Sequence, residues 1–202
     1  MDSLYAVVLF AISASVTPGP NNIMVMSAGA SVGIRKSLPL LMGICVGFTL
    51  MLLLVGLGFG QLFTRFPELH LFIKCAGTLY LLYLAWLIAR PTDGMTDSNG
   101  ARPFGFFKGA LFQWVNAKAW VVATGAIAAF TSAGSDPFEQ HLVIALTFFI
   151  ISFPCVGLLL LCGSPPKRWL ANDLARRRFN QVMAALLVLS VVPVIREILI
   201  PA

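Results

Sequence analysis

Charged residues are scarce in this chain of 202 residues, and acidic residues are the scarcest of all. Lys, Arg, Asp and Glu make up 11% of the sequence, whereas soluble domains contain about 25%. Hydrophobic residues make up 58%, and the mean hydropathy is +0.88. A chain of this composition lies outside the range of soluble globular domains, so the sequence indicates an integral membrane protein.

Motifs of enzyme chemistry are also missing. The chain has no nucleophile elbow, phosphate-binding loop or zinc motif. Its two histidines, His70 and His141, stand at predicted helix ends without metal-ligand spacing, and we expect both to be surface residues. No CxxC pair occurs among the four cysteines, which we expect to be apolar filler: Cys45, Cys75, Cys155 and Cys162. We therefore expect no enzyme activity, no ATP hydrolysis, no cofactor and no metal centre.

Six apolar stretches have the length of about 20 residues that a hydrocarbon core of ~30 Å requires. They cover residues 4–28, 38–60, 68–89, 106–130, 141–163 and 179–198. The start, Met1-Asp2-Ser3, lacks a basic segment, so we expect the first helix to be retained. The expected fold is an all-α integral membrane protein with six transmembrane helices in a single domain, 1–202. Because the connections are short, its function must lie inside the bundle.

The longest hydrophilic stretch divides the chain into two halves of three helices each. We expect a first repeat over 1–89, a cytoplasmic linker over 90–105 and a second repeat over 106–202. Because three is odd, the second half enters the membrane from the opposite face, which is the topology of an inverted repeat. The second helix of each half contains a proline, Pro39 or Pro154.

Basic residues are distributed unevenly between the two sets of loops. One set carries ten of the 14 lysines and arginines: Arg35, Lys36, Arg90, Arg102, Lys108, Lys167, Arg168, Arg176, Arg177 and Arg178. The opposite set carries Arg65, Lys74 and Arg196. Since cytoplasmic loops retain Lys and Arg, both termini are predicted to lie outside the cytoplasm. The same rule accounts for the net charge of +6, so we do not expect nucleic acid as a partner.

The first apolar stretch is interrupted near its middle by Thr17-Pro18-Gly19-Pro20-Asn21-Asn22. Two prolines remove backbone donors, so carbonyls from about Ala14 to Thr17 lose their partners and a helix must restart near Asn21. In lipid, such irregularity is tolerated where protein or a cavity satisfies the freed groups. The restarted helix would offer N–H groups and a positive dipole end to a carboxylate, and the freed carbonyls would accept from an ammonium. The alternative is a simple proline kink.

Lys118 lies near the midpoint of the fourth apolar stretch, where a charged side chain costs about 2.5–3.5 kcal/mol. No Asp or Glu lies at the centre of a span, so a substrate carboxylate is its candidate partner, and Lys118 is a candidate carrier of a coupled proton. The alternative is a lysine that snorkels to an interface roughly 18 Å away. Gln113 and Asn116 do not share a narrow helix face with Lys118. Either that helix is irregular, or only some of the three residues face a site.

For the small residues and the tryptophans we expect packing roles. Gly43 and Gly47 are spaced for close helix approach. Trp114 and Trp120 are expected to pack or to face lipid rather than to bind a ligand. Exposed small residues would permit a homodimer: Ala28, Gly29, Ala30 and Gly33.

The interrupted first helix and the sequence Gln113-Trp114-Val115-Asn116-Ala117-Lys118 together resemble the LysE/RhtB family of bacterial amino-acid exporters, over the whole chain. The resemblance implies a secondary transporter in the bacterial inner membrane that exports amino acids or close derivatives to the periplasm and is coupled to the proton gradient. In such a membrane, the termini predicted above from the basic residues would be periplasmic. Many members have Pro at the position of Ala117 and Asp at that of Asn21, and both departures resemble the branch that exports cysteine and O-acetylserine. Because the spans hold no acidic partner for a basic side chain, we favour neutral amino acids. The expected substrate-binding residues are Thr17, Pro18, Gly19, Pro20, Asn21, Asn22, Gln113, Asn116 and Lys118.

Two alternatives from other classes remain at this stage. A transmembrane thiol-disulfide electron carrier would use Cys45 and Cys155, which lie on the second helices of the two halves. A non-transporting scaffold would not need Lys118 at mid-depth.

Overall fold

The computed structural model describes residues 2–17, 19–59, 65, 67–89, 104–132, 136–163 and 173–199. All regular elements among these residues are helical, which confirms the all-α fold. They are α1 (Asp2–Val16), α2 (Pro20–Val32), α3 (Ile34–Leu54), the π-helical turn η1 (Val55–Phe59), α5 (Pro67–Ala89), α6 (Phe106–Val115), α7 (Ala117–Phe130), α8 (Pro137–Gly163) and α10 (Asp173–Leu199). Pro18 and most of the expected linker, 90–103, lie outside the described residues.

Two of the described helices are each long and apolar enough to cross a membrane: α3 with its continuation η1, and α8. The pair α1 and α2 is bent by 57° and counts as a third span if it crosses as one unit. Several helices begin earlier than the apolar stretches predicted. α3 begins at Ile34 and α8 at Pro137, because polar residues at the start of each helix continue its hydrogen-bonding pattern beyond the apolar part.

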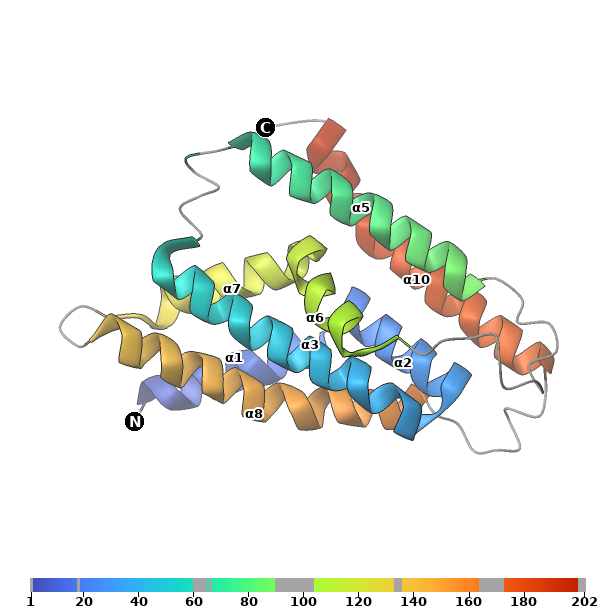
Figure 1. The fold of residues 1–202 in the computed structure, drawn as a ribbon, viewed down its shortest axis with the longest axis horizontal. Helices are drawn as coiled ribbons and strands as arrows, with labels where there is room; N and C mark the ends of the chain where they lie inside the picture. Colours follow the sequence, from blue (N-terminus) through green and yellow to red (C-terminus); the bar gives the residue numbers. More distant parts are fainter. Residues whose placement is uncertain are drawn as a thin grey trace.

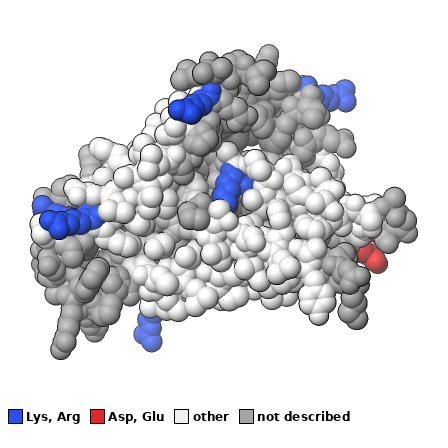
Figure 2. Space-filling model, turned by 180° about the vertical axis from the view of Figure 1, so that it is seen from behind, with Lys and Arg blue, Asp and Glu red and all other residues white. Residues whose placement is uncertain are grey.

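The outer surface of the bundle is apolar. Figure 2 shows one face on which the described residues are almost all uncharged, with basic side chains towards the edges and one in a hollow near the middle. Large apolar side chains are widely exposed on several helices, including Leu9, Leu79, Phe107, Val121 and Ile150 at 65–77%. Exposure of this extent is expected where lipid rather than water is the solvent.

Successive segments run in alternating directions across the bundle (Figure 1). The pair α1 and α2 runs one way, α3 returns, and α5 runs forward again; α6 with α7, α8 and α10 continue the alternation. α1 begins and α10 ends on the same side. The main packing pairs are α3 with α6 and α8, α8 with α1 and α2, and α5 with α10.

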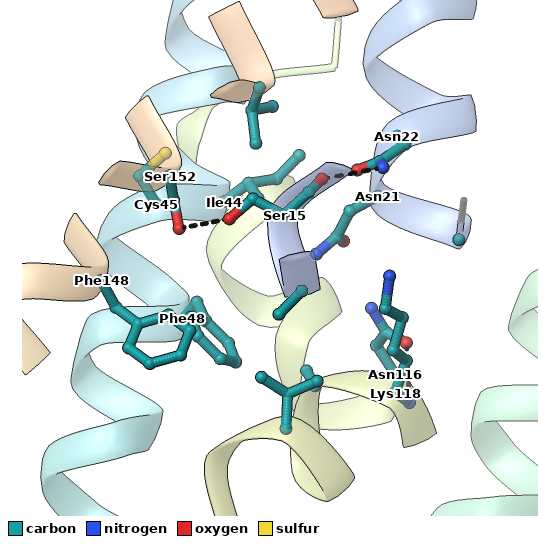
Figure 3. Close-up of a pocket in the computed structure, with 15 residues that line it drawn as sticks. Ser15, Asn21, Asn22, Ile44, Cys45, Phe48, Asn116, Lys118, Phe148 and Ser152 are labelled. Atoms are coloured by element: carbon teal, nitrogen blue, oxygen red, sulfur yellow. Dashed lines mark hydrogen bonds between the residues drawn. The ribbon is translucent and has the colours of Figure 1, made fainter. Parts of the chain in front are cut away.

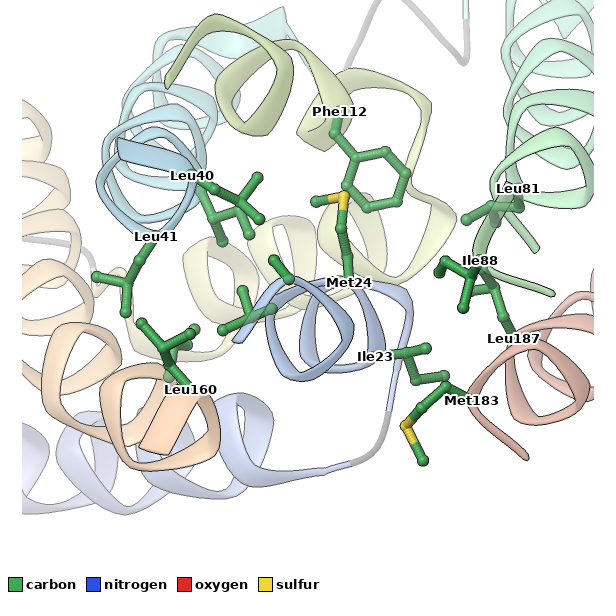
Figure 4. Close-up of a cluster of buried hydrophobic side chains, with 14 of the residues drawn as sticks. Ile23, Met24, Leu40, Leu41, Leu81, Ile88, Phe112, Leu160, Met183 and Leu187 are labelled. Carbon is green, nitrogen blue, oxygen red and sulfur yellow. The ribbon is translucent and has the colours of Figure 1, made fainter. Parts of the chain in front are cut away.

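One cluster of buried apolar side chains joins the two halves of the chain (Figure 4). At the centre of this cluster, Met24 of α2 lies beside Phe112 of α6, and the Phe112 side chain is 2% exposed (Figure 4). The antiparallel pair α5 and α10 joins this cluster through Ile23 of α2 and Met183 of α10. The pair α5 and α10 therefore lies on one flank of the bundle.

Glycines allow α3 and α6 to come into backbone contact. The spacing of Gly43 and Gly47 predicted such a close approach, and the structure confirms it. A Cβ on Gly43 would lie 2.0 Å from the carbonyl oxygen of Phe106, and one on Gly47 would lie 2.6 Å from the Cα of Ala110. Gly109 of α6 faces the Leu40 carbonyl in the same way, at 2.6 Å. The seam between α3 and α6 thus has no room for side chains, and it holds the first half tightly against the second.

Two expectations about exposure are wrong. Ala28, Gly29 and Ala30 are buried within the single chain, because α2 packs against α3, α8 and α10. A homodimer therefore needs a different surface. His141 is also buried, at 7% exposure, because Gly56 in η1 leaves room for its ring.

Candidate functional site

The break between α1 and α2 leaves carbonyls without backbone partners, as predicted, and side chains satisfy them. The amide nitrogen of Asn22 donates to the carbonyl oxygens of Ser15 and Thr17, at 3.0 Å each. α2 then begins at Pro20 with extended Gly19 as its N-cap, and no side chain caps this helix end. Pro20 occupies the first turn, where its missing N–H costs nothing. The interruption is therefore a true helix break with its own internal partners.

A second break lies between α6 and α7, and it resolves the spacing of Gln113, Asn116 and Lys118. The backbone of Asn116 is extended, with φ −88° and ψ 103°, and its side-chain oxygen accepts from the backbone N–H of Lys118 at 3.2 Å. The indole N–H of Trp120 donates to the freed carbonyl of Trp114 at 2.9 Å. Of the two alternatives left open for this stretch, local irregularity of the helix is confirmed.

Hydrogen bonds join the two breaks. Asn21 and Gln113 form a reciprocal amide pair, with N···O distances of 2.9 and 3.1 Å, and Gln113 is fully buried. Lys118 donates from Nζ to the carbonyl oxygen of Thr17 at 2.5 Å. Gly19 lies directly against the Lys118 side chain, because a Cβ there would stand 3.0 Å from Lys118 Cδ. Packing thus brings residues from two distant stretches of sequence into one constellation.

A small cavity of about 60 Å³ lies between the breaks. Five of the nine predicted site residues line it: Gly19, Asn21, Asn22, Asn116 and Lys118 (Figure 3). Thr17 and Gln113 contact this lining through the hydrogen bonds above, and Pro20 is buried at the start of α2. Pro18 lies outside the described residues.

The cavity also has lining residues that sequence reasoning missed. Ser15 of α1 and Ser152 of α8 form a hydroxyl pair with an O···O distance of 3.0 Å. Cys45, taken from the sequence as apolar filler, is 1% exposed and lines the same cavity. Pro154, two residues after Ser152, stands out in the sequence as a proline inside a helix. No sequence pattern indicated that Ser15 and Ser152 would contact each other.

The electrostatics of the cavity favour an anion. The first turns of α2 and α7 both line it, so two helix N-termini direct their positive dipole ends there, and Lys118 adds a full charge. The lining contains no carboxylate. Among the described residues, no group of three potential metal ligands comes together anywhere.

A site between two broken helices in an apolar bundle is typical of one class: membrane transporters that bind small solutes at discontinuous helices. Comparison with known proteins gives the particular family. The model of the LysE type translocator family matches residues 12–197, so the chain belongs to this family and is an amino-acid export protein.

Several curated relatives carry the name cysteine/O-acetylserine efflux protein. A cysteine/O-acetylserine efflux protein of Klebsiella pneumoniae is 32% identical over 202 residues, covering 95% of this chain and 96% of the relative. The protein of that name in Salmonella typhimurium is 35% identical over 68% of this chain and 70% of its own length. The one in Escherichia coli K12 is 36% identical over 57% of this chain and 59% of its own length. No solved structure gives a significant match.

Proposed function

We propose that this exporter binds a zwitterionic amino acid in the cavity between the two breaks, with the substrate carboxylate at Lys118. The observation that carries the proposal is the meeting of Lys118 with the N-termini of α2 and α7 in a lining without carboxylates. A carboxylate placed there would gain charge-assisted hydrogen bonds, which are about twice as strong as neutral ones. It would also supply the counter-ion that the residues lining the cavity do not provide.

The substrate ammonium would bind where Lys118 now donates. In the structure, the Thr17 carbonyl accepts from the lysine ammonium and from Asn22. When a substrate carboxylate draws Lys118 towards itself, the Thr17 carbonyl becomes available to the substrate ammonium. The substrate would therefore replace one hydrogen bond between the two breaks with two contacts of its own.

We infer a neutral substrate, of the kind named by the relatives: cysteine, O-acetylserine or a close derivative. A basic side chain would be desolvated in the cavity without an acidic partner, which is costly. The cavity of about 60 Å³ has room for only a few water molecules at ~15 Å³ each, whereas ligand pockets span about 300–1,000 Å³. Substrate entry therefore requires the cavity to widen.

In the membrane, we infer six spans arranged as two inverted repeats, in a bacterial inner membrane with both termini in the periplasm. Supporting features are the alternating helix directions and a break in the first segment of each half. The packing is also symmetric between the halves. The second segment of the first half, α3, packs on α6 in the first segment of the second half, and α8, the second segment of the second half, packs on the α1–α2 pair. We further propose coupling to the proton gradient, with Lys118 as the candidate carrier. A homodimer stays a prediction from the sequence.

The test is export from proteoliposomes that contain the purified full chain. Vesicles loaded with radiolabelled cysteine, O-acetylserine, serine or lysine would be assayed with and without an imposed pH gradient. We expect the neutral compounds to leave faster than from protein-free vesicles, the gradient to accelerate their exit, and lysine to be retained. Export of lysine alone would overturn the neutral-substrate proposal, and export that ignores the gradient would overturn proton coupling.

A further inference from the structure

The cavity has two ends of different chemistry (Figure 3). Asn21, Asn116 and Lys118 lie at one end, and Cys45, Phe148 and Ser152 lie at the other, with Ser15 between them. If the amino-acid backbone binds at the Lys118 end, as proposed above, the substrate side chain must point towards the other end. The groups at that end therefore decide which side chains are accepted.

The Ser15–Ser152 pair retains hydrogen-bonding capacity. Other hydroxyls in these helices donate to the carbonyl four residues earlier, as Thr49 does to Cys45 and Thr147 does to Val143. Ser15 and Ser152 instead share one hydrogen bond with each other, and neither hydroxyl has another partner among the described residues. Each hydroxyl offers one donor and two acceptor positions, so the pair keeps one proton and several lone pairs for a ligand.

The surroundings of the pair restrict what this ligand can be. The rings of Phe48 and Phe148 stand together as a wall, with centroids 5.5 Å apart, and Cys45 completes the end without adding charge. A charged side chain would lose its hydration here without gaining a counter-ion. A large aliphatic side chain would leave the two hydroxyls desolvated and without a new partner.

We propose that the Ser15–Ser152 pair determines side-chain specificity. It selects amino acids with a short, uncharged side chain that carries a hydroxyl, thiol or ester oxygen, and the proposal rests on the backbone-binding mode given under Proposed function. The ligand atom bonds to the free positions of the pair, while the aromatic wall limits the length of the side chain. Alanine, which lacks this atom, binds more weakly.

The test compares competition by serine and by alanine against export of labelled O-acetylserine from proteoliposomes. In the wild type, serine should compete more strongly than alanine. Ser152→Ala should weaken competition by serine ~3–10-fold, the loss expected for one neutral hydrogen bond, and should change competition by alanine less than about 2-fold. Ser15→Ala should act in the same direction. Ser27→Ala, in a buried serine of α2 outside the cavity, should leave the ratio unchanged.

Binding gives a second measurement that does not require export. Serine should raise the unfolding temperature of the detergent-solubilised wild type more than alanine does, and this difference should disappear in Ser152→Ala but persist in Ser27→Ala. Equal losses for serine and alanine, or no loss for either, would overturn the specificity role while leaving the exporter assignment intact. If the wild type neither exports nor binds any of the three compounds, both this inference and the proposed function are wrong.

Discussion

Lys118 donates its ammonium hydrogen bond to the backbone carbonyl of Thr17, 101 residues earlier in the chain. The carbonyl is available because a helix ends there, and the lysine is correctly placed because another helix begins one residue before it. The first break therefore supplies the hydrogen-bond acceptor, and the second break positions the donor. The predictions below follow from this relationship and from the packing that maintains it.

Replacing Lys118 with alanine should reduce the initial rate of export by roughly 10- to 100-fold, since charge-assisted hydrogen bonds contribute about 1.5–3 kcal/mol. The rate would be measured in proteoliposomes with matched protein content. Lys108→Ala is the control, because Lys108 is exposed on α6 and lies over the Phe104 ring, away from the cavity. Export by Lys118→Ala at the control rate would exclude a central role for this lysine.

Gly19→Ala should impair export through Lys118. The backbone of Gly19 is extended, so alanine fits the conformation, but its Cβ would lie 3.2 Å from Lys118 Nζ and displace the side chain. We expect a fall in export of about 3- to 10-fold, with the unfolding temperature in detergent nearly unchanged. Gly125→Ala on α7 is the matched control because a Cβ there meets nothing within 4 Å. Similar export by both variants would contradict the prediction.

Asn21 and Gln113 should show strong energetic coupling. Asn21→Ala leaves the buried Gln113 amide without this partner, and Gln113→Ala leaves the half-buried Asn21 amide without it. A buried unpaired amide costs about 1–3 kcal/mol, whereas the double variant removes both groups. We therefore expect the double variant to be less destabilised than the sum of the two single variants. A double-mutant cycle on unfolding in detergent measures this difference, and strict additivity would show that the pair contributes no joint stability.

Gly43→Ala should destabilise the bundle. The new Cβ would collide with the backbone of Phe106, which cannot move without separating α3 from α6, and overpacking of this kind costs about 1–3 kcal/mol. Gly157→Ala on α8 provides a control because the nearest atom to its Cβ lies at 3.9 Å. Thermal unfolding in detergent should rank Gly43→Ala well below this control, and equal stability would refute the close seam.

An electron carrier would need its cysteines for activity, whereas an exporter of the kind proposed here does not. All four are free, and membership of a translocator family does not favour electron transfer. The double substitution Cys45→Ser and Cys155→Ser should therefore retain export within a few-fold of the wild type. Complete loss of activity, with the protein still folded, would return the thiol-based mechanism to consideration.

The sequence alone determined the class of protein and the position of the first break. Scarcity of charge and the lengths of the apolar stretches indicate a membrane bundle, and the two prolines at 18 and 20 interrupt a helix because proline lacks a donor. These are properties of single residues and their near neighbours, so they can be read without the fold. The isolated charge of Lys118 indicated a site by the same logic.

Tertiary structure decided the rest. The break at Asn116 has no proline to mark it, and it persists because its freed groups find partners in Asn116 itself and in Trp120. The pairs Asn21–Gln113 and Ser15–Ser152 join residues 92 and 137 positions apart, and burial of His141 depends on a glycine in another helix. The spacing of Gly43 and Gly47 marks one contact face on α3, but that its partner is α6 is decided by packing over the whole bundle.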